Sequence, residues 1–78
     1  MPLFTIVEND YFITTDVKIL KYNIVEISDI DVKTEKREID IHNIIQLIYS
    51  ALNRQFCYCD IVELPNMIMK VNNRLVAT

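Results

Sequence analysis

The chain has no glycine among its 78 residues, and this absence constrains its fold and function more than any other feature. Glycine supplies about 7% of an average protein and adopts backbone conformations that a Cβ atom hinders. Phosphate-binding loops, dinucleotide-binding turns, the nucleophile elbow of α/β-hydrolases and EF-hand calcium loops all depend on glycine. The sequence therefore excludes these sites, and tight turns must be made by asparagine, aspartate, serine, lysine or glutamate.

A length of 78 residues predicts one small globular domain, spanning residues 1–78. Apolar residues make up 51% of the chain, enough for a core without a metal or a disulfide, and 24% of the residues are charged. No apolar run approaches the roughly 18 residues of a membrane span, so we expect no membrane association. The N-terminus lacks the basic region and cleavage site of a signal peptide, which indicates an intracellular protein.

The first segment is predicted to form a β-hairpin. Residues 3–8 and 11–16 are rich in β-branched and aromatic side chains, and Asn9-Asp10 between them tolerates the positive φ of a two-residue turn. Side chains alternate between the two faces of a strand. One face of this hairpin, which we expect to contact the core, therefore carries Phe4, Ile6, Tyr11 and Ile13.

The middle of the chain is predicted to continue the sheet. Residues 17–27 fit a helix or a strand by spacing, and their β-branched content favours a strand. The apolar positions change parity at Ser28-Asp29, which indicates a turn or a β-bulge. A second hairpin is predicted from residues 30–33 and 38–41, with residues 34–37 between them.

The C-terminal part is predicted to add three more strands. Residues 56–63 form one strand that ends before Pro65, and residues 67–71 and 74–77 form a hairpin around Asn72-Asn73. Asparagine takes the place of glycine in this turn as well.

One helix is predicted, over residues 41–54. Apolar side chains recur there at helical spacing, at positions 41, 44, 45, 48 and 52. Asp40 stands where an N-cap belongs, and Arg54 stands where a cation meets the negative end of the helix dipole. The predicted fold class is α+β, a small antiparallel sheet of five to seven short strands with one α-helix packed on it.

The polar face of this helix is the most informative feature for function, because no residue from Ile41 to Asn53 is charged. Solvent-facing helices normally carry Lys and Glu pairs, whereas interface cores are depleted in charge and enriched in tyrosine. We therefore predict a surface that a second protomer or a partner protein covers. The alternative is an ordinary exposed polar face. The predicted partner-binding residues on the helix are His42, Gln46, Tyr49 and Asn53.

Acidic residues suggest a second candidate surface. Residues 1–40 hold nine of the 11 acidic side chains, and the sequence pI is about 4.9. Asp29, Asp31, Glu35 and Glu38 form either solvated faces or a surface that binds a basic partner. Three cations within the same stretch weaken the second interpretation.

Cys57-Tyr58-Cys59 and His42 are the candidates for chemistry. Residues two apart in a strand point to the same side, so both thiols share a face. A structural zinc site needs four ligands, and the chain has one histidine, so core positions are the favoured interpretation over a metal site or a small enzyme. We therefore predict no enzyme activity and no cofactor.

Nucleic-acid binding is a further alternative. It would use base stacking by the sheet aromatics Tyr11, Phe12, Tyr22 and Phe56, with Lys70 and Arg74 as a local positive spot. An acidic protein lacks the clustered Lys and Arg that phosphate binding needs, so we do not favour this alternative.

The sequence as a whole predicts a small, non-enzymatic protein–protein interaction module. Thirteen isoleucines and few Ala, Arg and Pro residues indicate AT-rich coding, which is typical of many viruses, phages and low-GC bacteria. We therefore expect a viral or phage accessory protein in the host cytoplasm, acting as a homodimer or as an inhibitor of a host protein.

Overall fold

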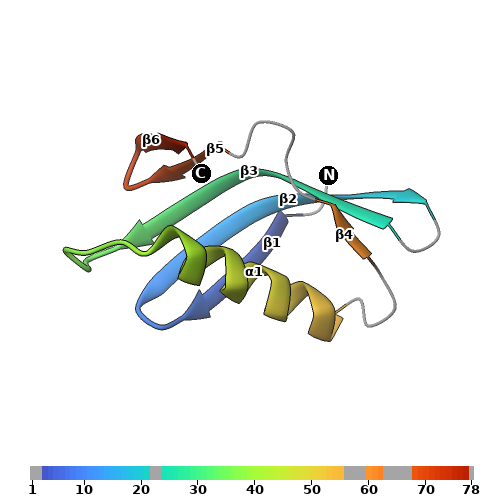
Figure 1. The fold of residues 1–78 in the computed structure, drawn as a ribbon, viewed down its shortest axis with the longest axis horizontal. Helices are drawn as coiled ribbons and strands as arrows, with labels where there is room; N and C mark the ends of the chain where they lie inside the picture. Colours follow the sequence, from blue (N-terminus) through green and yellow to red (C-terminus); the bar gives the residue numbers. More distant parts are fainter. Residues whose placement is uncertain (1–2, 22–23, 56–59, 63–67, 78) are drawn as a thin grey trace.

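A computed structural model describes residues 3–21, 24–55, 60–62 and 68–77 of the chain. These residues form one helix and six strands (Figure 1), which are β1 (Leu3–Glu8), β2 (Tyr11–Lys21), β3 (Ile24–Thr34), α1 (Ile41–Gln55), β4 (Asp60–Val62), β5 (Ile68–Val71) and β6 (Arg74–Ala77). The predicted α+β fold class, with one helix packed on a sheet of short strands, is confirmed.

The strands form one sheet in the order β1-β2-β3-β5-β6, and β4 pairs with β3 outside this path. The β1–β2, β2–β3 and β5–β6 pairs are antiparallel, whereas β3 runs parallel to both β4 and β5. β4 pairs with the first residues of β3, and β5 pairs with its last residues. The sheet is therefore mostly antiparallel. β3 is its central strand, because it pairs with β2 on one side and with β4 and β5 on the other.

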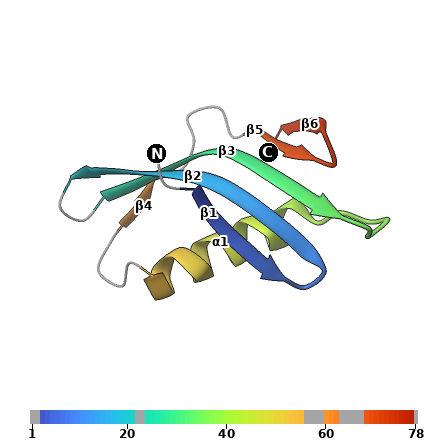
Figure 2. The same cartoon turned by 180° about the vertical axis from the view of Figure 1, so that it is seen from behind.

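One face of the sheet packs against α1, as Figures 1 and 2 show from opposite sides. Ile44, Ile48 and Leu52 of α1 are fully buried there against the apolar side chains of the sheet. Burying a side chain of this kind is worth about 1.5–3 kcal/mol. The buried apolar residues of the sheet are Ile6, Tyr11, Ile13, Val17, Val25, Ile27, Ile30, Val32, Met69 and Val71.

Both asparagine-containing turns form as the sequence predicts. Asn9, Asp10, Asn72 and Asn73 all have positive φ, between 50° and 69°, and none of them is glycine. In the first hairpin, Ile6 lies opposite Ile13, both are buried, and Phe4 packs against the same core. Residues whose backbone tolerates the left-handed region therefore replace glycine in both turns.

The predicted parity change at Ser28-Asp29 is a β-bulge. The pairing of β2 with β3 shifts between Thr14 and Asp16, and Asp29 has a φ of 52°. The Thr15 side chain is fully buried opposite this bulge, and its hydroxyl donates a hydrogen bond of 2.8 Å to the carbonyl of Ser28. The bulge lets Ile27 and Ile30 both reach the core despite their odd spacing.

The helix begins at Ile41 as predicted and ends one residue later than predicted, at Gln55. Asp40 caps it, because the Asn43 amide donates to Asp40 Oδ1 at 3.3 Å and the Ile44 amide donates to the Asp40 carbonyl at 3.1 Å. The side chain of Asp40 thus satisfies an amide at the start of α1 that has no partner within the helix.

The prediction of one strand over residues 17–27 is wrong. Lys21 of β2 lies opposite Ile24 of β3, so the chain reverses direction between them and two antiparallel strands take the place of one. The apolar alternation of Leu20, Tyr22 and Ile24 continues through this reversal, and no glycine or proline marks it.

The predicted second hairpin is also wrong. Residues 24–34 form a single strand, and residues 35–40 form no strand but connect β3 to α1. Ile39 and Ile41 alternate like strand residues, yet both pack against the core from the connection and the first helical turn. The predicted strand over residues 56–63 is described only in part, as β4.

Candidate functional site

Four exposed and uncharged side chains form a narrow stripe along α1, which we call the α1 stripe. It consists of His42, Gln46, Ser50 and Asn53. These residues follow one another at intervals of three or four, so they lie along one side of the helix. The side of α1 that packs on the sheet is buried, and the α1 stripe is therefore the outer surface of this layer.

Two residues at the border of the α1 stripe differ from it. Tyr49 is half-buried and packs against the core, so it flanks the exposed face instead of lying within it. Arg54 is the first charged residue of the helix, and its guanidinium lies 3.7 Å from Glu8 Oε2 of β1. His42, Gln46 and Asn53 are thus the predicted partner-binding residues that the structure brings together.

The four predicted acidic residues do not form one surface. Asp29 is exposed at the β-bulge, and Glu35 and Glu38 are exposed in the connection to α1, separated from Asp29 by roughly 15 Å of strand. Asp31 is half-buried, and Lys33 Nζ lies 3.6 Å from its Oδ1. Interleaved cations therefore reduce the acidic character of this half of the molecule.

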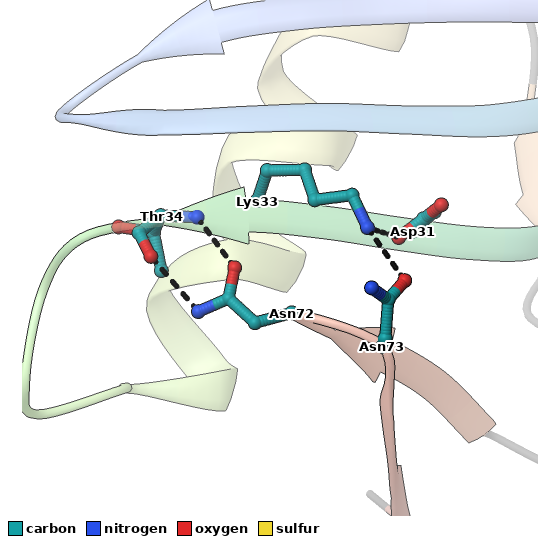
Figure 3. A network of polar contacts seen from close by, with 5 residues as sticks. All are labelled: Asp31, Lys33, Thr34, Asn72 and Asn73. Carbon is teal, nitrogen blue, oxygen red and sulfur yellow. Dashed lines mark hydrogen bonds and ion pairs between the residues drawn. The ribbon is translucent and has the colours of Figure 1, made fainter.

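A network of polar contacts joins the end of β3 to the β5–β6 turn (Figure 3). The Thr34 amide donates to Asn72 Oδ1 at 3.0 Å, and Asn72 Nδ2 donates to the Thr34 carbonyl at 2.8 Å. Lys33 Nζ donates to Asn73 Oδ1 at 2.7 Å. The Thr34 hydroxyl donates to the Asp10 carbonyl of the first hairpin turn at 2.8 Å, so one residue connects both turns.

The groove beside this network has a volume of about 790 Å³ and contains charges of both signs. Its lining includes Lys33, Lys36, Asp10 and Glu35, together with Phe12. Lys33 Nζ is already held by Asn73 and Asp31, and Lys36 Nζ lies over the Tyr11 ring, 4.7 Å from its centroid. These contacts favour a structural role for the polar groups over a site for an anion.

Asp31 Oδ1 is a buried atom without a hydrogen-bond partner, although the whole side chain is 40% exposed. The ammonium of Lys33 at 3.6 Å supplies the nearest positive charge. Because the ion pair is partly exposed, its contribution to stability is small.

The residues that the structure describes contain no group of three or more His, Cys, Asp or Glu side chains that could hold a metal ion. The predicted candidates Cys57 and Cys59 lie outside the described residues, so the structure leaves their role as a prediction.

The structure removes some of the residues on which the alternative of nucleic-acid binding depended. Tyr11 is 2% exposed, which leaves its ring no free face for a base. Lys70 pairs with Leu75 and Arg74 pairs with Val71, so the two cations point to opposite faces of the hairpin. Phe12 remains exposed, and Tyr22 and Phe56 lie outside the described residues.

The free edge of β1 is a surface that the sequence reasoning missed. β1 pairs with β2 on one side and is the first strand of the sheet, so its other side meets no described strand. Leu3 and Val7 are 63% and 74% exposed on this strand. Their alternation with the core-facing Phe4 and Ile6 was visible in the sequence, but the edge position depends on the strand order.

Within the part of the chain that the structure describes, no helix is both long and apolar enough to cross a membrane. Comparisons of the chain with protein-family models, with curated protein sequences and with solved structures find no match. Any function must therefore be argued from the surfaces described above.

Proposed function

We propose that this protein is a small, non-enzymatic interaction module that binds another protein through the α1 stripe. The observation that carries the proposal is the lack of charge on His42, Gln46, Ser50 and Asn53, the exposed side of the only layer that covers the core face in the described structure. Interface centres are depleted in charge, whereas exposed helices gain solubility from charged pairs.

The dispersed acidic residues support the choice of the α1 stripe over the acidic half of the chain. Asp31 is paired with Lys33, and Asp29 lies apart from Glu35 and Glu38, so the four residues do not form a single negative surface. Residue usage typical of AT-rich coding supports, as the specific form of this function, a viral or phage accessory protein that inhibits a host protein.

Site-specific photocrosslinking in the cell of origin tests this proposal. A photoreactive amino acid at Gln46 is expected to give a discrete adduct with a partner protein, and the same group at Arg37, in the exposed connection, is expected to give none. An adduct of twice the chain mass of 9.2 kDa identifies a second copy as the occupant. Equal labelling from Gln46 and Arg37 would contradict the proposal.

A charged double variant provides the matched control. Gln46→Glu with Asn53→Lys leaves the net charge unchanged and alters only exposed positions, so folding is expected to persist. Because burial of unpaired charges opposes binding, we expect this variant, with the photoreactive amino acid moved to Ser50, to lose the adduct that the same group at Ser50 gives in the otherwise unaltered chain. Arg37→Glu with Glu38→Arg also leaves the net charge unchanged, reverses two charges in the exposed connection and is expected to retain the adduct.

A further inference from the structure

The free edge of β1 lacks the features that usually prevent edge strands from pairing. Natural edge strands carry lysine, proline or a β-bulge. β1 has neither lysine nor proline from Leu3 to Glu8, and its pairing with β2 is unbroken over all six residues. Glu8 is its only charged residue.

The hairpin register fixes which backbone groups face outward. Glu8 and Tyr11 flank a two-residue turn and lie opposite each other, so they exchange both hydrogen bonds, and the pattern alternates from there. The amides and carbonyls of Phe4, Ile6 and Glu8 consequently point to β2. Those of Leu3, Thr5 and Val7 point to the free edge.

A groove runs along this edge beneath β1. It has a volume of about 450 Å³ and is lined by residues 4–8 of β1 and by Ala51, Arg54 and Gln55 of α1. Figures 1 and 2 both show α1 crossing β1, with its C-terminal turn beyond the free edge. A strand added to β1 would therefore lie over this turn of the helix.

We propose that the free edge of β1 is a docking site for one extended, uncharged and largely apolar strand of a partner protein, which adds to the sheet beside β1. This proposal concerns a different surface from the α1 stripe, so each stands independently of the other. Main-chain hydrogen bonds to Leu3, Thr5 and Val7 provide affinity in this mode of binding, and alternate side chains provide specificity.

The charges of the site define the chemistry of the partner strand. Residues 3–7 carry no charge, and Glu8 at their end is matched by Arg54 at 3.7 Å. A charged side chain beside Leu3 or Val7 would find no counter-ion on β1, so uncharged β-branched or apolar residues complement this edge.

The position of α1 favours a lone strand over a second copy of the chain. A two-fold axis beside β1 would bring the C-terminal turns of two α1 helices beneath the same pair of strands. A lone strand meets only one helix, and its inward side chains would lie over the groove that β1 and the last turn of α1 line.

A labelled synthetic peptide with the sequence Leu-Phe-Thr-Ile-Val, which repeats residues 3–7, serves as the probe. Antiparallel pairing centred on Thr5 places apolar residues beside Leu3 and Val7 and threonine beside threonine. We expect saturable binding to the full chain by fluorescence anisotropy. Five residues a side is small against the roughly 20–30 of a standard interface, so the Kd is expected in the micromolar range or weaker.

N-methylated versions of the peptide separate strand pairing from general apolar adhesion. Methyl groups on the amides of its Leu, Thr and Val residues remove the donors that face β1, and are expected to weaken binding at least about tenfold. Methyl groups on the Phe and Ile amides face away and are expected to leave binding within about threefold. Equal effects of the two patterns, or no saturable binding, would overturn the proposal.

The Thr5→Pro variant tests the protein side of the same contact. It removes an amide that faces the free edge and spares the bonds to β2, so peptide binding is expected to fall at least about tenfold. Circular dichroism checks its fold, and the N-methylated peptides decide the question on the unaltered chain if the variant does not fold. A Thr5→Cys chain that forms a disulfide dimer in dilute solution would identify a second copy as the occupant and overturn the choice of a foreign strand.

Discussion

The side-chain amide of Asn72 pairs with both backbone groups of Thr34, accepting from its amide at 3.0 Å and donating to its carbonyl at 2.8 Å. The Asn72 backbone amide donates to the Val32 carbonyl at 2.8 Å, so the backbone and side chain of Asn72 together continue the β3–β5 pairing beyond Val71 as far as Thr34. The Thr34 hydroxyl meanwhile binds the Asp10 carbonyl. The two hairpin turns are thus fixed to the same end of β3.

This relationship predicts different effects for the two asparagines of the β5–β6 turn. Asn72→Gly keeps the positive φ but loses both contacts to Thr34, and is expected to lower the free energy of unfolding by about 1–2 kcal/mol. Asn73→Gly creates the preferred Asn-Gly turn and loses one exposed contact to Lys33, so we expect a change within about 0.5 kcal/mol. Urea unfolding measures both, and equal destabilisation would contradict the role assigned to Asn72.

The β-bulge predicts a strong dependence on the residue at position 29. Asp29 is exposed and has a φ of 52°, a conformation that β-branched residues strongly disfavour. Asp29→Val is therefore expected to cost about 1–3 kcal/mol, whereas Asp29→Gly is expected to be neutral or stabilising by up to about 1 kcal/mol. A valine variant as stable as the glycine variant in thermal unfolding would show that the chain has no bulge there.

Thr15 is expected to stabilise the bulge through its hydroxyl. Thr15→Val keeps the shape of this fully buried side chain but leaves the Ser28 carbonyl without its 2.8 Å donor, at a cost of about 1–2 kcal/mol. Thr14→Val, on the opposite face of the same strand, is the control and is expected to change stability by less than about 0.5 kcal/mol. If Thr15→Val unfolds at the same urea concentration as the wild type, the hydrogen bond contributes nothing.

The N-cap of α1 predicts a graded series at position 40. Asp40→Ala removes the acceptor of the Asn43 amide and is expected to destabilise the chain by about 1 kcal/mol. Asp40→Asn keeps an acceptor and is expected to stay within a few tenths of a kcal/mol of the wild type. Circular dichroism during heating measures the series, with Glu38→Ala in the exposed connection as the control. The expected order of thermal stability is wild type, then Asp40→Asn, then Asp40→Ala. Any other order would argue against the role of Asp40 as the N-cap.

Local signals in the sequence were sufficient to predict the two asparagine-containing turns and the helix, and to predict a turn or a β-bulge at Ser28-Asp29. Asn9-Asp10 and Asn72-Asn73 are strong turn formers between apolar strands, and the apolar spacing of residues 41–52 fits only a helix at that length. The parity change at Ser28-Asp29 located the bulge because side chains in a strand alternate strictly.

Long-range relationships could not be predicted in the same way. The parallel pairing of β3 with β4 and β5 joins segments that lie on opposite sides of the helix in the sequence. Residues 22–23, between β2 and β3, include no glycine or proline. Ile39 and Ile41 alternate like strand residues, although Ile39 packs from the connection and Ile41 from the first helical turn. In these places tertiary contacts override the local pattern.

Of the candidate surfaces, only the one on α1 could be predicted from the local sequence pattern. The lack of charge on α1 identified His42, Gln46 and Asn53, because helix periodicity alone determines which side they share. The grouping of Asp29, Asp31, Glu35 and Glu38 depended on a hairpin that does not form. The free edge of β1 depended on the strand order, which no local pattern contains.

Amide hydrogen exchange in β1, followed by NMR on dilute chain, tests most directly whether this edge is open to another protein. The account predicts an alternating pattern, with Phe4, Ile6 and Glu8 exchanging slowly because they bond to β2, and Thr5 and Val7 exchanging at least about tenfold faster. The strand peptide is expected to slow Thr5 and Val7 selectively. Uniformly slow exchange along β1 in the free, dilute chain would contradict the account, since it would mean that the edge is already paired.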